Sequence, residues 1–316
     1  MKSLSRSEVA RWLREHDNYL ILTHRRPDGD TIGSAAVLCR GLRQLGKTAH
    51  VLRNMEVTEK YLHLHQGLTK DCPDGNDTVI SVDVAAVSLF PESWSHLVER
   101  IALRIDHHGS GAAFAPLELV EPGTGACGEI IYELLTQLGV HLDRPMAEAL
   151  YTAVATDTGG FRYANTTGHS FRTAAACVEA GGDIHGINQA IFETNSFAKL
   201  RLHGWLTENI RFYQEGKIAL CALPKAVEQQ LGLTEDDLEN VSGFPRSIEG
   251  VKIAATLRQT ADGLVKVSVR ALPGFDAAAV CAKFGGGGHK GAAGATLKAE
   301  LEEAAAMVAM EMENLF

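Results

Sequence analysis

Residues 18–46 read NYLILTHRRPDGDTIGSAAVLCRGLRQLG. The apolar run NYLILTH predicts a short buried strand, and TIGSAAVLCRGLRQLG predicts an amphipathic helix that ends on Gly46. The connection between them, which we expect to be an extended loop, carries His24, Asp28 and Asp30 within seven positions. Crowded carboxylates repel one another, and a fold tolerates them only when something cationic lies between them. This strand-to-helix connection is therefore a candidate cation site.

The first two thirds of the chain continue this alternation of short apolar and amphipathic runs. Further strands are predicted at 48–53, 77–84 and 101–108, and helices at 128–139, 144–157 and 168–182. Strand–helix–strand alternation implies a parallel sheet covered on both faces. We therefore predict an α/β fold with a doubly wound, mostly parallel sheet.

The pattern changes after an amphipathic stretch at 194–213, which predicts a connecting helix. Strands are then predicted at 217–224, 251–260 and 264–272, followed by a helix at 275–284, a glycine-rich loop at 285–294 and a closing helix at 299–316. The turn ADG, between the second and third of these strands, is typical of a hairpin. We expect a first domain over 1–190, a linker helix over 191–215 and a smaller α/β domain over 216–316.

Composition narrows the class of protein. The 316 residues are 45% hydrophobic and 22% charged, as in a globular protein, and contain no apolar run long enough to span a membrane. Six scattered cysteines without a C-x-x-C pair argue against a disulfide framework and favour a reducing cytoplasm. A net charge of −9 argues against binding long or duplex nucleic acid, but it leaves room for a small anionic substrate in a local pocket.

Acidic residues and histidines recur at the ends of the predicted elements. Because the carboxyl ends of parallel strands form one edge of a sheet, we expect these side chains to meet there. A single Asp after a strand is ordinarily a cap or turn residue, but several together with histidines suit Mn²⁺, Fe²⁺, Co²⁺ or Zn²⁺ better than Mg²⁺. The negative charge of these carboxylates is better balanced by two divalent cations than by one. The residues are His24, Asp28, Asp30, Asp83, Asp106, His107, His108 and Asp157.

Four motifs in this order resemble the pattern of the DHH phosphoesterase superfamily. They are THRRPDGDTIGSA (23–35), SVDVA (81–85), DHH (106–108) and TAVATDTGGFRY (152–163). A fifth, FGGGGHKGAAGA (284–295), resembles the glycine-rich signature of the DHHA1 substrate domain. The match covers nearly the whole chain. Its length resembles the stand-alone nanoRNase/pAp-phosphatase group, whereas RecJ exonucleases carry more domains and family II pyrophosphatases have a different second domain.

The resemblance implies a role for each residue of the acidic cluster. One metal would be held by His24, Asp28 and Asp83, and the other by Asp30, Asp83, His107 and Asp157, with Asp83 bridging and Mn²⁺ as the usual metal. His108 would contact the scissile phosphate or protonate the leaving oxygen. Asp106 would either accept a hydrogen bond from a histidine ring, fixing its tautomer, or stabilise the loop.

The glycine-rich stretch is a candidate phosphate cradle, although glycine runs are often only flexible turns. Glycine lets backbone N–H groups approach an anion closely, and a forked guanidinium recognises phosphate through two bonds. In the family this domain grips the substrate end away from the cut, so that a cradle at a fixed distance from the metals would favour short substrates. The candidates are Arg270, Gly286, Gly287, Gly288, His289 and Lys290.

The resemblance implies a manganese-dependent phosphoesterase that degrades short oligoribonucleotides to 5′-mononucleotides from the 5′ end. The same site could remove the 3′-phosphate of 3′-phosphoadenosine 5′-phosphate (pAp). Alternatives are a phosphodiesterase of cyclic dinucleotides or their linear products, a nucleotide-sensing protein without catalysis, and a pyrophosphatase. The sequence leaves open whether the chain forms a homodimer. We interpret the remaining histidines, His169 among them, as surface or core residues.

Overall fold

A seven-stranded sheet forms the centre of the first of two units, Met1–Thr194. The strand order is β1-β7-β6-β5-β2-β3-β4, and every neighbouring pair is parallel. The strands are β1 (Lys2–Ser3), β2 (Tyr19–Leu22), β3 (Ala49–Leu52), β4 (Thr69–Lys70), β5 (Thr78–Val82), β6 (Ile101–Asp106) and β7 (Leu117–Val120). The computed structural model describes residues 1–109, 111–238 and 241–316.

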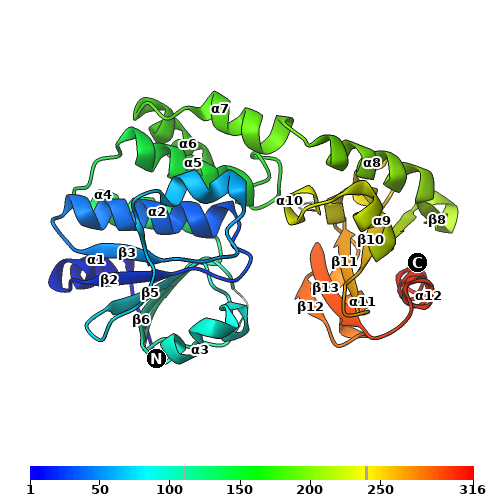
Figure 1. The fold of residues 1–316 in the computed structure, drawn as a ribbon, viewed down its shortest axis with the longest axis horizontal. Coiled ribbons are helices and arrows are strands. Elements are labelled where there is room, and N and C mark those ends of the chain that lie inside the picture. Colours follow the sequence, from blue (N-terminus) through cyan, green and yellow to red (C-terminus); the bar gives the residue numbers. More distant parts are fainter. Residues whose placement is uncertain (110, 239–240) are drawn as a thin grey trace. The chain divides into compact units, whose positions relative to one another are not determined.

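Helices cover both faces of this sheet, which confirms the predicted doubly wound α/β fold (Figure 1). One face packs against α1 (Arg6–Glu15), α2 (Gly29–Gln44), α4 (Cys127–Gln137), α5 (Arg144–Asp157) and α6 (Gly168–Glu179). The other face packs against η2 (Val87–Leu89), η3 (Glu92–Trp94) and α3 (Ser95–Val98). Strand β2 shows why both faces are apolar, because Tyr19 and Ile21 join one core while Leu20 and Leu22 join the other. The unit also contains η1 (Glu59–His65), α7 (Ile184–Asn188) and η4 (Gln189–Glu193).

The expected loop after β2 is shorter than predicted, because α2 begins at Gly29. The carboxylate of Asp28 caps this helix, accepting hydrogen bonds from the backbone N–H groups of Asp30 and Thr31, both at 3.1 Å. Asp30 therefore lies on the first helical turn and not in an extended loop. Glycine at position 33 lets α2 pack directly on α5, since a Cβ there would clash with the backbone carbonyl of Ala149.

The second unit, Asn195–Phe316, contains a six-stranded mixed sheet in the order β12-β13-β11-β10-β9-β8. Its strands are β8 (Arg211–Tyr213), β9 (Ile218–Leu223), β10 (Ile253–Gln259), β11 (Val265–Ala271), β12 (Gly287–His289) and β13 (Ala292–Leu297). Only the β9–β10 pair is parallel among these described strands. The antiparallel β10–β11 pair confirms the hairpin predicted around ADG.

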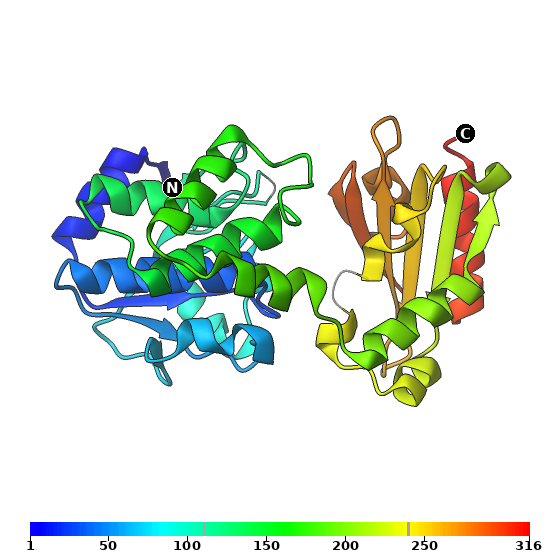
Figure 2. The same ribbon diagram turned by 90° about the horizontal axis from the view of Figure 1, so that it is seen from above.

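Helices also cover this second sheet on both faces. In Figure 2, α12 (Leu301–Glu313) runs beside the sheet; together with α11 (Ala277–Ala282) it packs on one face. The other face packs against α8 (Phe197–Asn209) and α9 (Lys225–Leu231), where Leu202 and Leu206 contact Cys221 and Leu223. The remaining elements are η5 (Gln214–Gly216), α10 (Glu235–Leu238), η6 (Val241–Gly243) and η7 (Pro245–Ser247).

Two predictions for the second unit are wrong in detail. The helix expected over 194–213 ends at Asn209, and the following residues form β8, an edge strand whose backbone pairs with β9. The glycine-rich stretch expected as a loop is the hairpin β12–β13. Glycine makes that pairing possible, because a Cβ on Gly286 or Gly288 would overlap the backbone of β13.

Among the described helices, none combines the length and the apolar character that a bilayer-spanning segment requires.

Candidate metal centre

The predicted acidic cluster assembles at the carboxyl edge of the parallel sheet. His24 and Asp28 follow β2, Asp83 follows β5, and Asp106, His107 and His108 lie at the end of β6. The first turn of α2 supplies Asp30, and the last residue of α5 is Asp157. Three overlapping sets of side chains have ligand atoms within 4.8 Å of one another: His24, Asp28 and Asp83; Asp30, His107 and Asp157; and Asp83, His107 and His108.

Backbone carbonyls fix the orientation of two histidine rings. The Nδ1 atom of His24 lies 2.8 Å from the carbonyl oxygen of Arg25, and Nδ1 of His107 lies 3.1 Å from that of Thr124. A carbonyl only accepts, so each Nδ1 carries the proton and each Nε2 keeps its lone pair in the neutral ring. Both Nε2 atoms face the carboxylates. With the proton on Nδ1, each Nε2 has the free lone pair that a metal ligand requires.

Asp83 lies between the two histidines. Its Oδ2 atom is 3.9 Å from Nε2 of His24, and its Oδ1 atom is 3.5 Å from Nε2 of His107. The backbone of Asp83 is in the left-handed region, with φ of 57°, which Asp and Asn tolerate better than most residues. One carboxylate thus faces both His24 and His107, with one oxygen toward each.

Unpartnered atoms in this cluster fit bound cations. Within the described chain, Oδ1 of Asp83 and Nε2 of His107 are buried without a hydrogen-bond partner. Nε2 of His107 also lies 3.8 Å from Asp30 and 3.6 Å from Asp157. These separations are too long for hydrogen bonds, but ligand atoms that share an ion at about 2.1 Å lie roughly 3 to 4.2 Å apart, depending on the angle between them at the ion. Carboxylate and imidazole donors together suit Mn²⁺, Co²⁺, Fe²⁺ or Zn²⁺.

Burial and mutual repulsion perturb the acids of the cluster. Burial, together with Asp30 and Asp28, raises the pKa of Asp83 well above its usual value. Burial and the charge of Asp30 also raise the pKa of Asp157, to about 8. Asp28 behaves differently, because its ion pair with His24 outweighs the effect of burial and lowers the pKa of Asp28 to about 2. Without a cation, the cluster therefore holds protons that a metal has to displace.

Asp30 has a second structural role. Its Oδ2 accepts a hydrogen bond from the backbone N–H of Cys127 at 2.6 Å, and its Oδ1 accepts one from Gly128 at 3.0 Å. These are the first residues of α4, so Asp30 caps that helix from a distant part of the chain. Ser34 donates to Oδ1 of the same carboxylate at 2.9 Å. The position of Asp30 is therefore fixed by α2 and α4 together.

Asp106 makes both kinds of hydrogen bond considered from the sequence. Its Oδ1 lies 2.8 Å from Nδ1 of His108 and also accepts from the backbone N–H groups of His107 and His108. Burial alone would raise the pKa of Asp106, but His108 and Arg104 outweigh it and lower that pKa. The carboxylate therefore stays ionised and holds the proton of His108 on Nδ1.

Two supporting residues were missed in the sequence. Arg104 is buried and ion-paired with Oδ2 of Asp106, and the signal was its position two residues earlier on the same strand face. Asn165 donates to the carbonyl of Gly125 at 2.8 Å and to the backbone and side chain of Asp157 at 3.1 and 3.3 Å. No local pattern marks Asn165, because the contact depends on the fold around the loop after α5.

Two of the candidate phosphate-binding residues in the second unit lie at the same register position across neighbouring strands of its sheet. Arg270 on β11 pairs with Ala292 on β13, and Ala292 pairs with His289 on β12. Directly opposed residues project to the same face, so Arg270 and His289 flank the small side chain of Ala292. This face is opposite the one that contacts α11 and α12, where Val267, Val269 and Ala271 are buried.

The glycines of this hairpin differ from one another. Gly286 and Gly288 are required by the close approach of β13, whereas a Cβ on Gly287 would meet open space. Gly287, Gly288, His289 and Lys290 are all exposed. The backbone of Gly287 therefore offers the clearest approach to an anion, and the other two glycines have a packing role.

Comparison with known proteins supports the resemblance seen in the sequence. The chain matches the DHH family, N-terminal domain, over residues 18–154 and the DHHA1 domain over residues 219–314. A protein of Thermus thermophilus named bifunctional oligoribonuclease and PAP phosphatase NrnA is 34% identical over 286 residues, covering 88% of this chain and 83% of that protein.

Two solved structures share the fold. An exopolyphosphatase-related protein from Bacteroides fragilis superposes with a TM-score of 0.84 and 24% identity, covering 98% of this chain and 95% of that one. RecJ of Thermus thermophilus in complex with Mn²⁺ superposes with a TM-score of 0.56 and 17% identity, covering 98% of this chain and 54% of that one.

The raised pKa of Asp157 predicts how pH affects the metal-free protein. Its ordinary value is 3.8 and its value in the folded chain is about 8, so between these limits the folded state binds more protons than the unfolded state. Stability then falls as pH rises. We expect the stability advantage of Asp157→Asn over the wild type to grow from about pH 5 to about pH 8, on the order of 1 kcal/mol per pH unit at most.

Urea denaturation in EDTA at several pH values measures this difference. Comparing the two proteins cancels the contributions of distant groups such as His50, His65 and His203, whose pKa values are lowered by burial and which oppose the trend. A stability difference that is constant with pH, or that changes in the opposite direction, contradicts the account of Asp157.

Proposed function

We propose, from the premise that this chain belongs to the DHH family and hydrolyses phosphoester bonds, that its substrates are short oligoribonucleotides with a 5′-phosphate and pAp. The observation that carries the proposal is the position of Asp83, whose two oxygens face Nε2 of His24 and Nε2 of His107. The unpartnered Oδ1 of Asp83 and Nε2 of His107 favour cations between these groups.

These contacts support a division of the ligands into two sets. We assign His24, Asp28 and Asp83 to one divalent cation, and Asp30, Asp83, His107 and Asp157 to the other. When bound, such a pair of cations lowers the pKa of water and stabilises charge on phosphoryl oxygens. The donor set suits Mn²⁺, and the RecJ neighbour was crystallised in complex with Mn²⁺.

Asp106 and Arg104 would position His108 as the proton donor to the leaving oxygen. Asp106, held ionised by Arg104, keeps the His108 proton on Nδ1 and so turns Nε2 of that ring away from the carboxylate. His108 is half-exposed, with 36% of its side chain accessible. When the bond between phosphorus and the 3′ oxygen breaks, a protonated His108 would donate from Nε2 to that oxygen and recover the proton from solvent.

Both proposed substrates present the same unit. In a 5′-phosphorylated oligoribonucleotide and in pAp, a nucleoside 5′-phosphate carries a phosphoryl group on its 3′ oxygen. Cleavage of the bond between that oxygen and phosphorus releases a 5′-mononucleotide in each case. One binding mode would thus account for degradation from the 5′ end and for 3′-phosphate removal. The name of the Thermus thermophilus relative pairs an oligoribonuclease with a PAP phosphatase.

The second unit would recognise the 5′-phosphate. Arg270 and His289 share one face of the sheet around the small Ala292, with the backbone of Gly287 and the ammonium group of Lys290 exposed on the same hairpin. A guanidinium can bind a terminal phosphate through two bonds. Because a cyclic dinucleotide has no terminal phosphate, we expect linear dinucleotides to be better substrates than cyclic ones.

Asp83→Asn tests the cation site. Asn retains the shape of Asp and tolerates the left-handed backbone, so the variant should fold, but it removes a negative charge shared by both ligand sets. We expect hydrolysis of a 5′-phosphorylated dinucleotide with Mn²⁺ to fall by at least about 10²–10³-fold. The control is Asp71→Asn, an exposed acid paired with Arg53. Retained activity in Asp83→Asn would reject the assignment.

Arg270→Lys tests recognition of the 5′-phosphate, because it keeps the charge and loses the fork. For 5′-phosphorylated dinucleotides we expect kcat/KM to fall by about 10- to 100-fold, the value of one charged hydrogen bond. The same dinucleotides with a 5′-hydroxyl should be nearly unaffected. Lys266→Ala, on the same strand, is the control. An equal loss for both substrates would show that Arg270 does not bind this phosphate.

A further inference from the structure

Helix α6 carries an apolar strip on its solvent-facing side. Phe171 and Val178 have 58% and 57% of their surface exposed, and Ala175 between them is also exposed. These residues recur at spacings of four and three, so they line one side of the helix. The residues that α6 buries lie toward the core of the first unit and are Ser170, Thr173 and Cys177. The strip is therefore apolar surface that the described fold leaves in contact with solvent.

The ring of Phe171 is held in place by a neighbouring loop. It stacks on Phe161, with ring centroids 5.2 Å apart and an angle of 23° between the planes. Phe161 itself packs against Tyr151, at 5.9 Å between centroids, and its backbone is in the left-handed region, with φ of 62°, which bulky residues rarely adopt. A large exposed ring that is already ordered loses little side-chain entropy when another surface covers it. Phe171 is thus suited to the centre of a binding surface.

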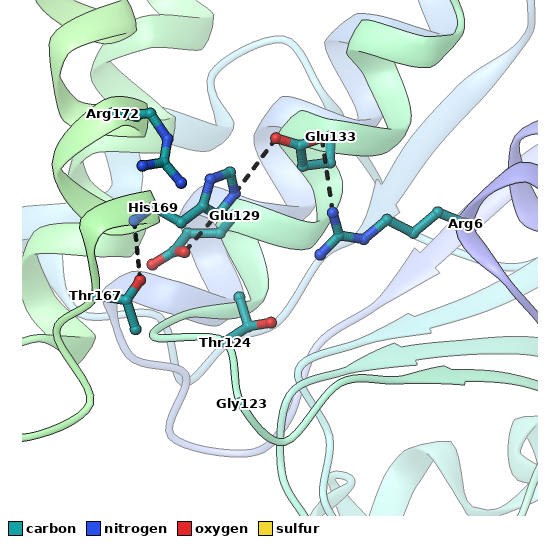
Figure 3. Close-up of a pocket in the computed structure, with 8 residues that line it drawn as sticks. All are labelled: Arg6, Gly123, Thr124, Glu129, Glu133, Thr167, His169 and Arg172. Carbon is teal, nitrogen blue, oxygen red and sulfur yellow. Dashed lines mark hydrogen bonds and ion pairs between the residues drawn. The ribbon is translucent and has the colours of Figure 1, made fainter.

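Two charged residues border the strip on the same side. Arg172 follows Phe171 and Glu179 follows Val178, so a rotation of about 100° per residue places both charges along one edge of the strip. Both are exposed, and neither forms an ion pair within the described residues. Figure 3 shows Arg172 beside a cavity of about 420 Å³, with no hydrogen bond or ion pair drawn to it. Seven positions, about 10.5 Å along the axis, separate the two charges, which is too far for them to pair within one helix.

The strip and its charges are complementary to a second copy of themselves. When two copies of α6 lie antiparallel about a twofold axis near Ala175, Arg172 faces the partner subunit's Glu179, and Glu179 faces the partner subunit's Arg172. The same rotation places Phe171 against the partner subunit's Val178, and the small Ala175 lets the two helices approach closely. A parallel arrangement would instead bring like charges together. The order of residues on α6 therefore favours an antiparallel pair.

We propose that this chain forms a homodimer in which α6 packs antiparallel against α6 of a second copy. A second copy fits the strip because its apolar residues cover one another and each charge meets an opposite charge across the axis. Helix α6, with 12 residues and a length of about 18 Å, forms the centre of the interface. Phe161 extends the interface onto the loop after α5, because it stacks on Phe171. That loop follows Asp157, so the dimer also braces the segment next to a proposed metal ligand.

Exchange of charges across the axis tests this arrangement. Sedimentation equilibrium of the full chain at several concentrations gives the dissociation constant of the dimer. Arg172→Glu sets like charges opposite each other at both contacts, and so does Glu179→Arg, so we expect each variant to raise that dissociation constant by about tenfold or more. An equimolar mixture of the two variants restores opposite charges at both contacts and should dimerise as tightly as the wild type. The control is Arg11→Glu, at an exposed position on α1.

Phe171→Ala tests the apolar strip, because the twofold axis removes the ring twice from each dimer. We expect the dissociation constant to rise by at least about 100-fold. The charge variants keep the stack of Phe171 on Phe161, so they report on the interface even if Phe171→Ala unfolds. A wild-type chain that stays monomeric at about 100 μM would leave the strip to another partner and overturn the proposal. A dimer that the α6 variants leave unchanged, or single charge variants that their mixture does not rescue, would also overturn it.

Discussion

Repulsion among carboxylates at one edge of the parallel sheet is the constraint on which the first unit depends. Asp28, Asp30, Asp83 and Asp157 approach one another where the strands end, and burial and mutual charge raise the pKa values of the last three. The fold offsets part of this cost with backbone groups, since Asp28 caps α2 and Asp30 caps α4. Bound cations would offset the rest of this repulsion, because Asp83 and His107 keep buried atoms without hydrogen-bond partners in the described chain.

The three histidines at this edge of the sheet differ in the group that holds each ring. His24 and His107 are held through Nδ1 by backbone carbonyls and direct Nε2 toward the acids. His108 is held through Nδ1 by Asp106, which in turn is paired with the buried Arg104. Consecutive histidines in the sequence thus have different partners, and this difference supports different roles, with His107 binding a cation and His108 supplying a proton.

Much of this was predictable from local pattern. Short apolar runs that alternate with amphipathic stretches predicted the α/β fold. Residues at strand ends were expected to meet because parallel strands share an edge. The secondary-structure predictions were wrong where local chemistry overrode the hydrophobic pattern. Asp28 extended α2 into an expected loop by capping it, and the glycines at 286 and 288 allowed a hairpin where a loop was expected. Asn165 acts through a contact with Gly125, forty residues away in the chain, which a single sequence does not display.

Anomalous scattering from crystals of the protein grown with Mn²⁺ tests the central claim most directly. The account predicts two strong manganese peaks, one on each side of the Asp83 carboxylate, the first within bonding distance of Nε2 of His24 and the second of Nε2 of His107. A map without peaks beside Asp83, or with a single ion that contacts neither histidine, would contradict it.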